Sequence, residues 1–231
     1  MKILAVDTST KTCSVALIDN LSLLAEQVLI SSRTHSKHLM RIINEVVDVS
    51  GCRMSDIDAF AVTKGPGTFT GLRIGISTVK GLACALSKPV LGISTLKALA
   101  MQLTSQTLIC SMLNAHRGEI YSARYRYVSS DEKKRLLKEE LCETVLPIDQ
   151  AVAGISEKCT FIGDGAVFYK KEIIDILGDL ALFAPRCLNV IFASTVAYAV
   201  AEKSQGNQFA SIEMLMPHYI RKPDAKLPKK E

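Results

Sequence analysis

Long apolar runs are absent from this sequence. No window holds the roughly 18 uninterrupted apolar residues of a membrane span, and the N-terminal stretch MKILAVDTST reaches Asp7 after only four apolar residues. A secretory signal needs a longer apolar segment than this. We therefore expect a cytoplasmic protein that makes no membrane contact.

The signatures of covalent and zinc hydrolases are absent as well. The sequence has no GxSxG elbow, no HExxH helix and no CxxC pair. Its seven cysteines are odd in number and widely spread, which fits a reducing compartment better than a disulfide framework. His35 and His38 lie three residues apart, but no nearby acid or cysteine completes a zinc ligand set. We expect no catalytic residue and no metal site.

Tryptophan is missing, and neither sign of charge is in strong excess. Hydrophobic residues make up 48% of the 231 residues and charged residues 22%, as in an ordinary folded domain or pair of lobes. Much of the formal charge of +5 comes from the basic tail 221–231, RKPDAKLPKKE. This tail permits a contact with nucleic-acid phosphates but does not indicate one.

Hydrophobic patterning predicts an α/β fold with two lobes of similar order. The first lobe, 1–100, reads as strands 2–7, 13–19 and 23–30, helix 36–50, strand 57–64, a helix to Leu86, strand 89–94 and a helix from Thr95. The second lobe, 101–220, repeats the βββαβα order, with strands 107–115, 119–128 and 134–145, a helix opened by Pro147, strand 158–162, helix 168–177 and a further helix at 189–205. No linker rich in Gly, Ser or Pro separates the halves.

Two strand ends carry polar turns that can face a nucleotide. Asp7, Thr8, Ser9 and Thr10 follow the first strand, where a carboxylate and hydroxyls can orient a hydrated Mg²⁺ and a phosphate. Gly163, Asp164 and Gly165 follow a strand of the second lobe in the same way. Ordinary hydrogen-bonded or glycine-supported turns explain both patterns equally simply, so each role stays open.

The segment KGPGTFTGLRIGIS, 64–77, leads from a strand into a helix. Its amides and the helix N-terminus could bind an anion, although it lacks the Gly-Lys-Ser/Thr of a Walker A loop. Alternatively, Gly71, Gly75 and Gly81 let another helix approach closely. We favour close packing and keep anion binding as the alternative.

Six segments, taken together and in this order, are typical of one family: MKILAVDTST, HSKHL, KGPGTFTGLRIGIS, NAHRGEIY, IGDGA and PHYIRKPDA. On these segments, which span essentially the whole chain, the sequence resembles the TsaB (YeaZ) family of bacterial tRNA threonylcarbamoyladenosine biosynthesis proteins. The GPGTFTGLRIG stretch is the most specific, whereas DTST and IGDGA are shared by many actin-like proteins.

The resemblance implies an actin-like ATPase fold (the class of Hsp70, sugar kinases and actin) with two RNase H-like lobes. It implies a non-catalytic subunit that supports the paralogous transferase TsaD in modifying the adenosine next to the tRNA anticodon. TsaD carries a metal-binding HxxxH, whereas HSKH here has the wrong spacing for that metal. A TsaE-type ATPase in the complex, ATP or ADP with Mg²⁺ at the complex interface, and indirect contact with tRNA are implied too.

The resemblance also implies a helical interface with TsaD or, without TsaD, with a second copy of the chain. The apolar stripe of helix 36–50 looks too broad for one lobe to bury, with Met40 and Val47 on its outward side. The interface candidates are His35, Leu39, Met40, Ile43, Val47, Thr70, Arg73, Ile74, Ser77 and Gly81.

Two other functions stay open. Asp7 and the actin-like turns are compatible with an independent nucleotide-dependent ATPase or phosphotransferase, although no residue has a convincing general-base setting. A glycoprotease activity has less support, because the sequence offers no metal or nucleophile constellation.

Overall fold

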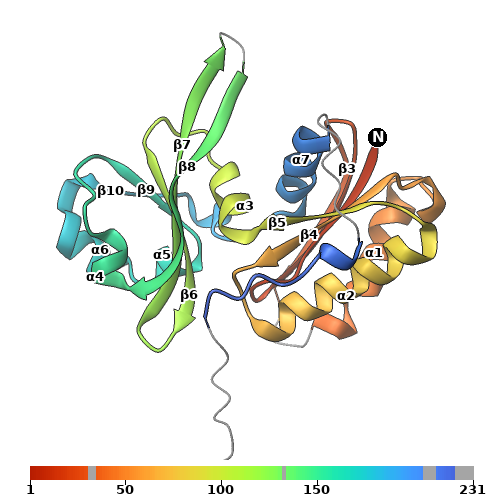
Figure 1. The fold of residues 1–231 in the computed structure, drawn as a ribbon, viewed down its shortest axis with the longest axis horizontal. Helices are drawn as coiled ribbons and strands as arrows, with labels where there is room; N and C mark the ends of the chain where they lie inside the picture. Colours follow the sequence, from red (N-terminus) through yellow and green to blue (C-terminus); the bar gives the residue numbers. More distant parts are fainter. Residues whose placement is uncertain (31–34, 132–133, 205–211, 222–231) are drawn as a thin grey trace, which may run out of the picture.

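The computed structural model describes residues 1–30, 35–131, 134–204 and 212–221, and its two lobes lie side by side (Figure 1). Each lobe contains a five-stranded sheet, in the orders β3-β2-β1-β4-β5 and β10-β9-β6-β7-β8. The first comprises β1 (Lys2–Asp7), β2 (Thr12–Asp19), β3 (Ser22–Ile30), β4 (Ala59–Gly65) and β5 (Val90–Ser94). The second comprises β6 (Leu108–His116), β7 (Glu119–Asp131), β8 (Lys134–Pro147), β9 (Cys159–Ile162) and β10 (Ala181–Phe183). In both, the first three strands pair antiparallel and the last two run parallel to the first.

The helices form three layers around the two sheets (Figure 1). The outer face of the first sheet carries α1 (Leu39–Val49) and α2 (Phe69–Leu86), and the layer between the sheets holds α3 (Thr95–Met101) and α7 (Ala193–Ser204). The outer face of the second sheet carries α4 (Ile148–Val152), α5 (Asp164–Phe168) and α6 (Lys170–Leu177). Single 3₁₀ turns are η1 (His35–Lys37), η2 (Met54–Asp56), η3 (Gly178–Leu180), η4 (Arg186–Leu188) and η5 (Ile212–Met214).

Strand alternation sorts the apolar side chains between these layers. In β1, Leu4 and Val6 pack with α1 and α2, whereas Ile3 and Ala5 pack with α3 and α7, because successive side chains of a strand point to opposite faces. The cluster around α3 and α7 continues into the second sheet through Leu113. The two lobes therefore share a core rather than meeting only at their surfaces.

The predicted strand and helix order is confirmed in both lobes, with two differences in the second. The predicted helix 168–177 corresponds to α6, whereas the short helix α5 before it and the strand β10 were not predicted. A strand of only three residues is too short to show a periodic pattern, so β10 had no sequence signal of its own.

Helix α7 corrects the predicted lobe boundary. Although 101–220 was assigned to the second lobe, α7 packs on β1 and β2 of the first sheet. Its first turn is also held there, since the Ala193 amide donates to Ser14 Oγ and the Ser194 amide to Glu26 Oε1, both at 2.9 Å. The reason is physical: the inner face of the first sheet is apolar and needs a helix to cover it.

Helix α2 alone, among the described residues, has the length and apolar composition of a membrane span. It also carries Arg73 and Lys80, and it buries Leu72, Val79 and Ala83 against the first lobe. We describe it as a helix of that lobe.

The expected exposure of the α1 stripe is wrong. Its five apolar residues, Leu39, Ile42, Ile43, Val46 and Val47, are all buried within the lobe, and even Val47 is only 4% exposed. They join a cluster with strands β1, β2 and β4 and with α2, which together cover the whole width of the stripe. Leu39, Ile43 and Val47 thus offer no exposed surface to a partner, whereas Met40 is 43% exposed.

We predict that Val47→Glu unfolds the first lobe instead of separating a complex. The substitution places an unpaired carboxylate in an apolar core, which should lower the free energy of unfolding by about 3 kcal/mol or more. Met40→Glu is the matched control on the same helix and should change the free energy of unfolding by less than about 0.5 kcal/mol. Urea unfolding measures both, and equal stability of the two variants would contradict the assignment.

Candidate functional site

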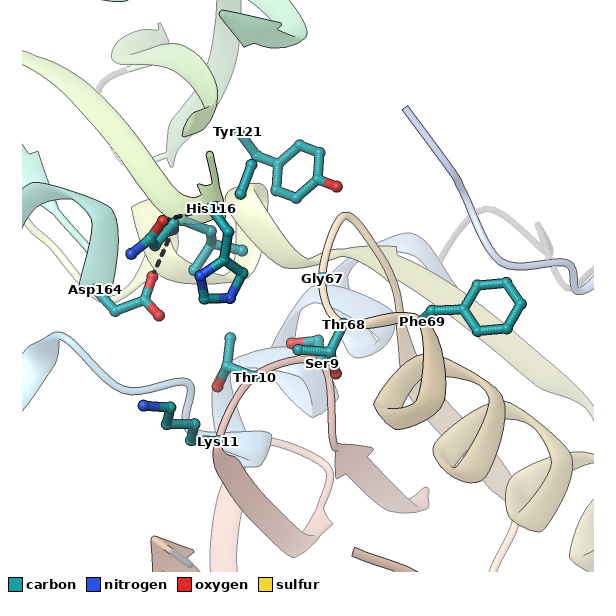
Figure 2. Close-up of a pocket in the computed structure, with 12 residues that line it drawn as sticks. Ser9, Thr10, Lys11, Gly67, Thr68, Phe69, His116, Tyr121 and Asp164 are labelled. Atoms are coloured by element: carbon teal, nitrogen blue, oxygen red, sulfur yellow. Dashed lines mark hydrogen bonds between the residues drawn. The ribbon is translucent and has the colours of Figure 1, made fainter. Parts of the chain in front are cut away.

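A cleft of about 360 Å³ lies between the lobes (Figure 2). One wall comes from the loop after β1 and the start of α2, and the other from the end of β6, from β7 and from the start of α5. The lining residues are Ser9, Thr10, Lys11, Gly67, Thr68, Phe69, Leu113, Asn114, Ala115, His116, Tyr121 and Asp164. Its volume falls in the range of small-molecule sites, and eight of its twelve lining residues have polar side chains.

Only some of the residues predicted to bind a nucleotide line this cleft. Ser9, Thr10 and Asp164 line it, on opposite walls, whereas Asp7, Thr8, Gly163 and Gly165 do not. Asp164 Oδ1 accepts a hydrogen bond from the Asn114 amide at 3.0 Å (Figure 2). Desolvation raises the pKa of the Asp164 carboxyl, while the Asn114 amide and the charges of His116 and Lys11 oppose this rise.

Asp7 organises the loop from inside the protein. It has no exposed surface, and its Oδ1 accepts hydrogen bonds from the Ser9 amide at 3.2 Å, from Ser9 Oγ at 2.6 Å and from Thr63 Oγ1 at 2.6 Å. Its Oδ2 has no hydrogen-bond partner among the described residues. Burial raises the pKa of Asp7, although these hydrogen bonds oppose the rise. A carboxylate sealed in this way does not fit the predicted role of holding a hydrated Mg²⁺ at the cleft.

The glycines of 64–77 explain why Asp7 is sealed. Helix α2 starts directly on the loop, since the Thr68 amide donates to Ser9 O at 2.7 Å and Thr8 Oγ1 donates to Gly71 O at 2.8 Å. A Cβ on Gly67, Gly71 or Gly75 would lie within 3.0 Å of Ser9 or Thr8. These three glycines therefore let α2 rest on the loop. Because Thr8 and Ser9 lie under α2 and Asp7 is buried, this turn does not fit a bound Mg²⁺-nucleotide.

Helix α2 thus makes the predicted close approach, but it packs on the loop after β1 and not on another helix. Gly71 and Gly75 are buried against the loop and cannot admit another helix. Gly81 lies on the opposite side of α2, where a Cβ would meet nothing within 4 Å. In the second lobe, Gly163 and Gly165 approach the backbone of Met112 and Leu113 on β6 in a similar way.

The two neighbouring histidines also turn inward. His35 Nε2 lies 2.8 Å from Thr10 O and so supports the loop, which leaves this candidate only partly exposed to a partner. His38 Nε2 is buried and has no hydrogen-bond partner in the part of the chain that the structure describes. Within the described ranges, no three His, Cys, Asp or Glu side chains gather as metal ligands.

The outer face of α2 is exposed along its length. Of the remaining interface candidates, Thr70, Arg73, Ser77 and Gly81 are exposed in helical register and Ile74 is partly exposed. A groove of about 500 Å³ runs between this face and the C-terminal segment 215–219. We call the exposed α2 residues and this segment the α2 surface.

Sequence reasoning missed the aromatic end of the α2 surface. Phe69 and Tyr219 stack with ring centroids 5.2 Å apart, and the Arg73 guanidinium lies 3.8 Å from the Phe69 ring centroid. Arg73 Nε also donates to Tyr219 Oη at 3.0 Å. Phe69 borders the cleft, but its ring points away from the other lining side chains (Figure 2) and the residue is 49% exposed, so the aromatic cluster belongs to the outer surface. No local pattern could have paired Phe69 with a residue so distant in the chain.

His218 had no assignable partner in the sequence but faces Glu143 in the structure. Its Nδ1 lies 3.0 Å from Glu143 Oε2, and Ser94 Oγ donates to the other carboxylate oxygen. The carboxylate thus lies between the hydroxyl and the imidazole, whereas a nucleophilic triad needs the imidazole in the middle. This cluster gives the glycoprotease hypothesis no support.

Comparison with known proteins identifies relatives that are similar over the full length of the chain. Residues 29–229 match the family model described as "TsaD: tRNA N6-adenosine threonylcarbamoyltransferase". The chain is 30% identical to the tRNA threonylcarbamoyladenosine biosynthesis protein TsaB of Escherichia coli, covering 100% of both chains, and 28% identical to TsaB of Bacillus subtilis, covering 97% and 96%.

Solved structures agree with this similarity and confirm the fold. YeaZ from Pseudomonas aeruginosa superimposes with a TM-score of 0.77 at 25% identity, covering 94% of this chain and 99% of YeaZ. Component A of the (R)-2-hydroxyglutaryl-CoA dehydratase of Acidaminococcus fermentans gives a TM-score of 0.50 at 11% identity, covering 89% and 99%, and supports the fold alone. The two-lobed chain has the actin-like ATPase fold expected above.

We predict that Gly71→Ala destabilises the protein and Gly81→Ala does not. The new methyl group at residue 71 overlaps the backbone of Thr8, and such overpacking should cost about 1–3 kcal/mol. At residue 81 the methyl group enters open space, where alanine should add up to about 1 kcal/mol through its helix propensity. Denaturant unfolding of both variants checks the pair, and an unaffected Gly71→Ala would mean that α2 does not rest on the loop.

We further predict a pH-dependent contribution from Asp7. Because its pKa is raised in the folded state above the ordinary 3.8, its contribution to stability is fully present below that value and is lost as pH rises through the folded-state pKa. Asp7→Asn removes this titration. The unfolding free energy of the wild type minus that of the variant should therefore fall from about pH 4 upward. Urea titrations across pH measure it, and a difference that rises with pH would refute the assignment.

Proposed function

Because this chain belongs to the TsaB family, we propose that it acts in the synthesis of threonylcarbamoyladenosine in tRNA as the non-catalytic partner of the transferase TsaD. Its similarity to TsaB covers the whole of both chains, and the TsaD family model matches most of the sequence. The proposed site of action is the cytoplasm, where a reducing environment suits its free cysteines.

The observation that carries the non-catalytic role is the closed loop after β1. This turn was predicted to face a phosphate, but α2 lies on Thr8 and Ser9, and Asp7 is buried beneath it. Asp7, the carboxylate predicted to hold Mg²⁺, therefore has no access to a nucleotide in the cleft. Any ATP or ADP with Mg²⁺ in the complex would then depend on groups supplied by TsaD or by a TsaE-type ATPase.

The α2 surface is the proposed docking site for TsaD. A face that presents Ser77 and Gly81 lets a partner helix come close, because small side chains shorten the distance between helix axes. Phe69 and Tyr219 supply partly exposed aromatic area at one end, and Arg73 and Lys80 supply positive charge beside it. The same surface would join two copies of the chain when TsaD is absent, and tRNA would be contacted through the complex.

We predict that Ser77→Arg weakens complex formation without unfolding the protein. Ser77 is exposed, so a long charged side chain fits the free protein but blocks an approaching helix. Binding to TsaD should weaken at least tenfold, since about 1.4 kcal/mol is lost per tenfold change and burying a charge costs more than that. Modification of tRNA in a reconstituted assay should fall with it.

Ser156→Arg is the matched control, because Ser156 is an exposed serine on the second lobe. It should leave binding and modification unchanged. Normal TsaD binding by a folded Ser77→Arg variant would rule out α2 as the docking surface. Sustained Mg²⁺-dependent ATP hydrolysis by the chain alone would instead contradict its non-catalytic role.

A further inference from the structure

The C-terminal segment 215–221 begins on the first lobe and ends on the second (Figure 1). At its start, Leu215 is 5% exposed and packs in the outer core of the first lobe, against Gly92 of β5. Three residues later the His218 amide donates to Lys64 O at the end of β4, at 2.6 Å. The first half of the segment is therefore fixed to the first sheet.

The second half of the segment is tied to the second lobe. Arg221 donates to Ala115 O at 2.8 Å and forms an ion pair with Glu119 at the start of β7. The Arg221 side chain is only 23% exposed, so this contact is more than a loose surface pair. Ala115 also lines the cleft, and the segment thus holds one of its walls directly.

Glu143 on β8 adds a second tie between the lobes. It lies beside His218 at 3.0 Å and accepts a hydrogen bond from Ser94, which ends β5 and caps α3. The Glu143 side chain is 10% exposed. A carboxylate this well buried is costly to separate from its partners, so the contact favours one arrangement of the lobes.

Tyr219 lies between these two ties and belongs to the α2 surface. It stacks on Phe69, and its hydroxyl accepts a hydrogen bond from Arg73. A partner that presses on Phe69 and Arg73 therefore meets a residue whose chain neighbours, His218 and Arg221, contact the second lobe. Seven consecutive residues thus connect the α2 surface with the wall of the cleft.

We propose that residues 215–221 form a clamp that holds the cleft between the lobes closed and couples its opening to docking on the α2 surface. The coupling rests on the proposed function, since it needs a partner on α2, whereas the clamp itself does not. Displacing Tyr219 releases Arg221 from Ala115 and Glu119, and the β6–β7 turn can then move away from Ser9 and Thr10.

Hydrogen exchange of the free protein tests the clamp. Arg221→Ala should speed amide exchange in residues 113–121 by at least about tenfold, the effect of losing one charge-assisted hydrogen bond, and leave exchange in α1 unchanged. Arg186→Ala, which removes an exposed arginine from η4, should change neither region. Unchanged exchange in 113–121 of the Arg221→Ala variant would overturn the clamp.

The same measurement with TsaD added tests the coupling. In the wild type, TsaD should speed exchange in 113–121; in Arg221→Ala, TsaD should bind with no further increase there. If TsaD binds the wild type while exchange in 113–121 stays the same or slows, the coupling is wrong and the docking proposal survives. If TsaD does not bind the wild type, the proposed function fails, and with it the coupling, while the free-protein result still decides the clamp.

Discussion

The contact between the start of α2 and the loop after β1 controls most of the first lobe. Asp7 shapes the loop through three hydrogen bonds to its Oδ1, and Gly67, Gly71 and Gly75 lack the side chains that would keep α2 off it. With one face of α2 fixed against the loop, its opposite face is turned to solvent. One close approach therefore seals the turn that was predicted to face a nucleotide and orients the surface that we assign to docking.

Much of the fold was predictable because its signals are local. Alternation marked the strands, helical spacing marked α1, and glycine pairs marked the turns that follow β4 and β9. The glycines of α2 also correctly predicted a close approach of this helix to another part of the chain. The glycines could not predict which residues α2 contacts, since Thr8 lies 63 residues before Gly71 and no local pattern encodes a contact over such a distance. The candidate site was recovered only in part for this reason, and Lys11, His116 and Tyr121 were missed.

Two errors have a different cause, which is the geometry of packing. A wide apolar stripe on α1 suggested an uncovered surface, but a twisted sheet and a neighbouring helix bury such a stripe on several sides, and Val47 is enclosed with the rest. Asp7 has the residue type and position of a cation ligand, yet burial decides its chemistry. Burial depends on the path of α2, so the sequence of the loop alone could not reveal it.

The lobes share a strand order but not the same outer surface, and the difference lies in one helix. Helix α2 runs unbroken for 18 residues after β4, whereas the chain at the same point of the second lobe, after β9, forms α5 and α6 of 5 and 8 residues. The helix is interrupted at Tyr169, so neither α5 nor α6 presents a face as long as that of α2 to a partner helix. Among the described residues, the outer face of α2 is therefore the extended helical face to which we assign docking. The C-terminal segment that crosses between the lobes is the element through which we propose that docking affects the second lobe.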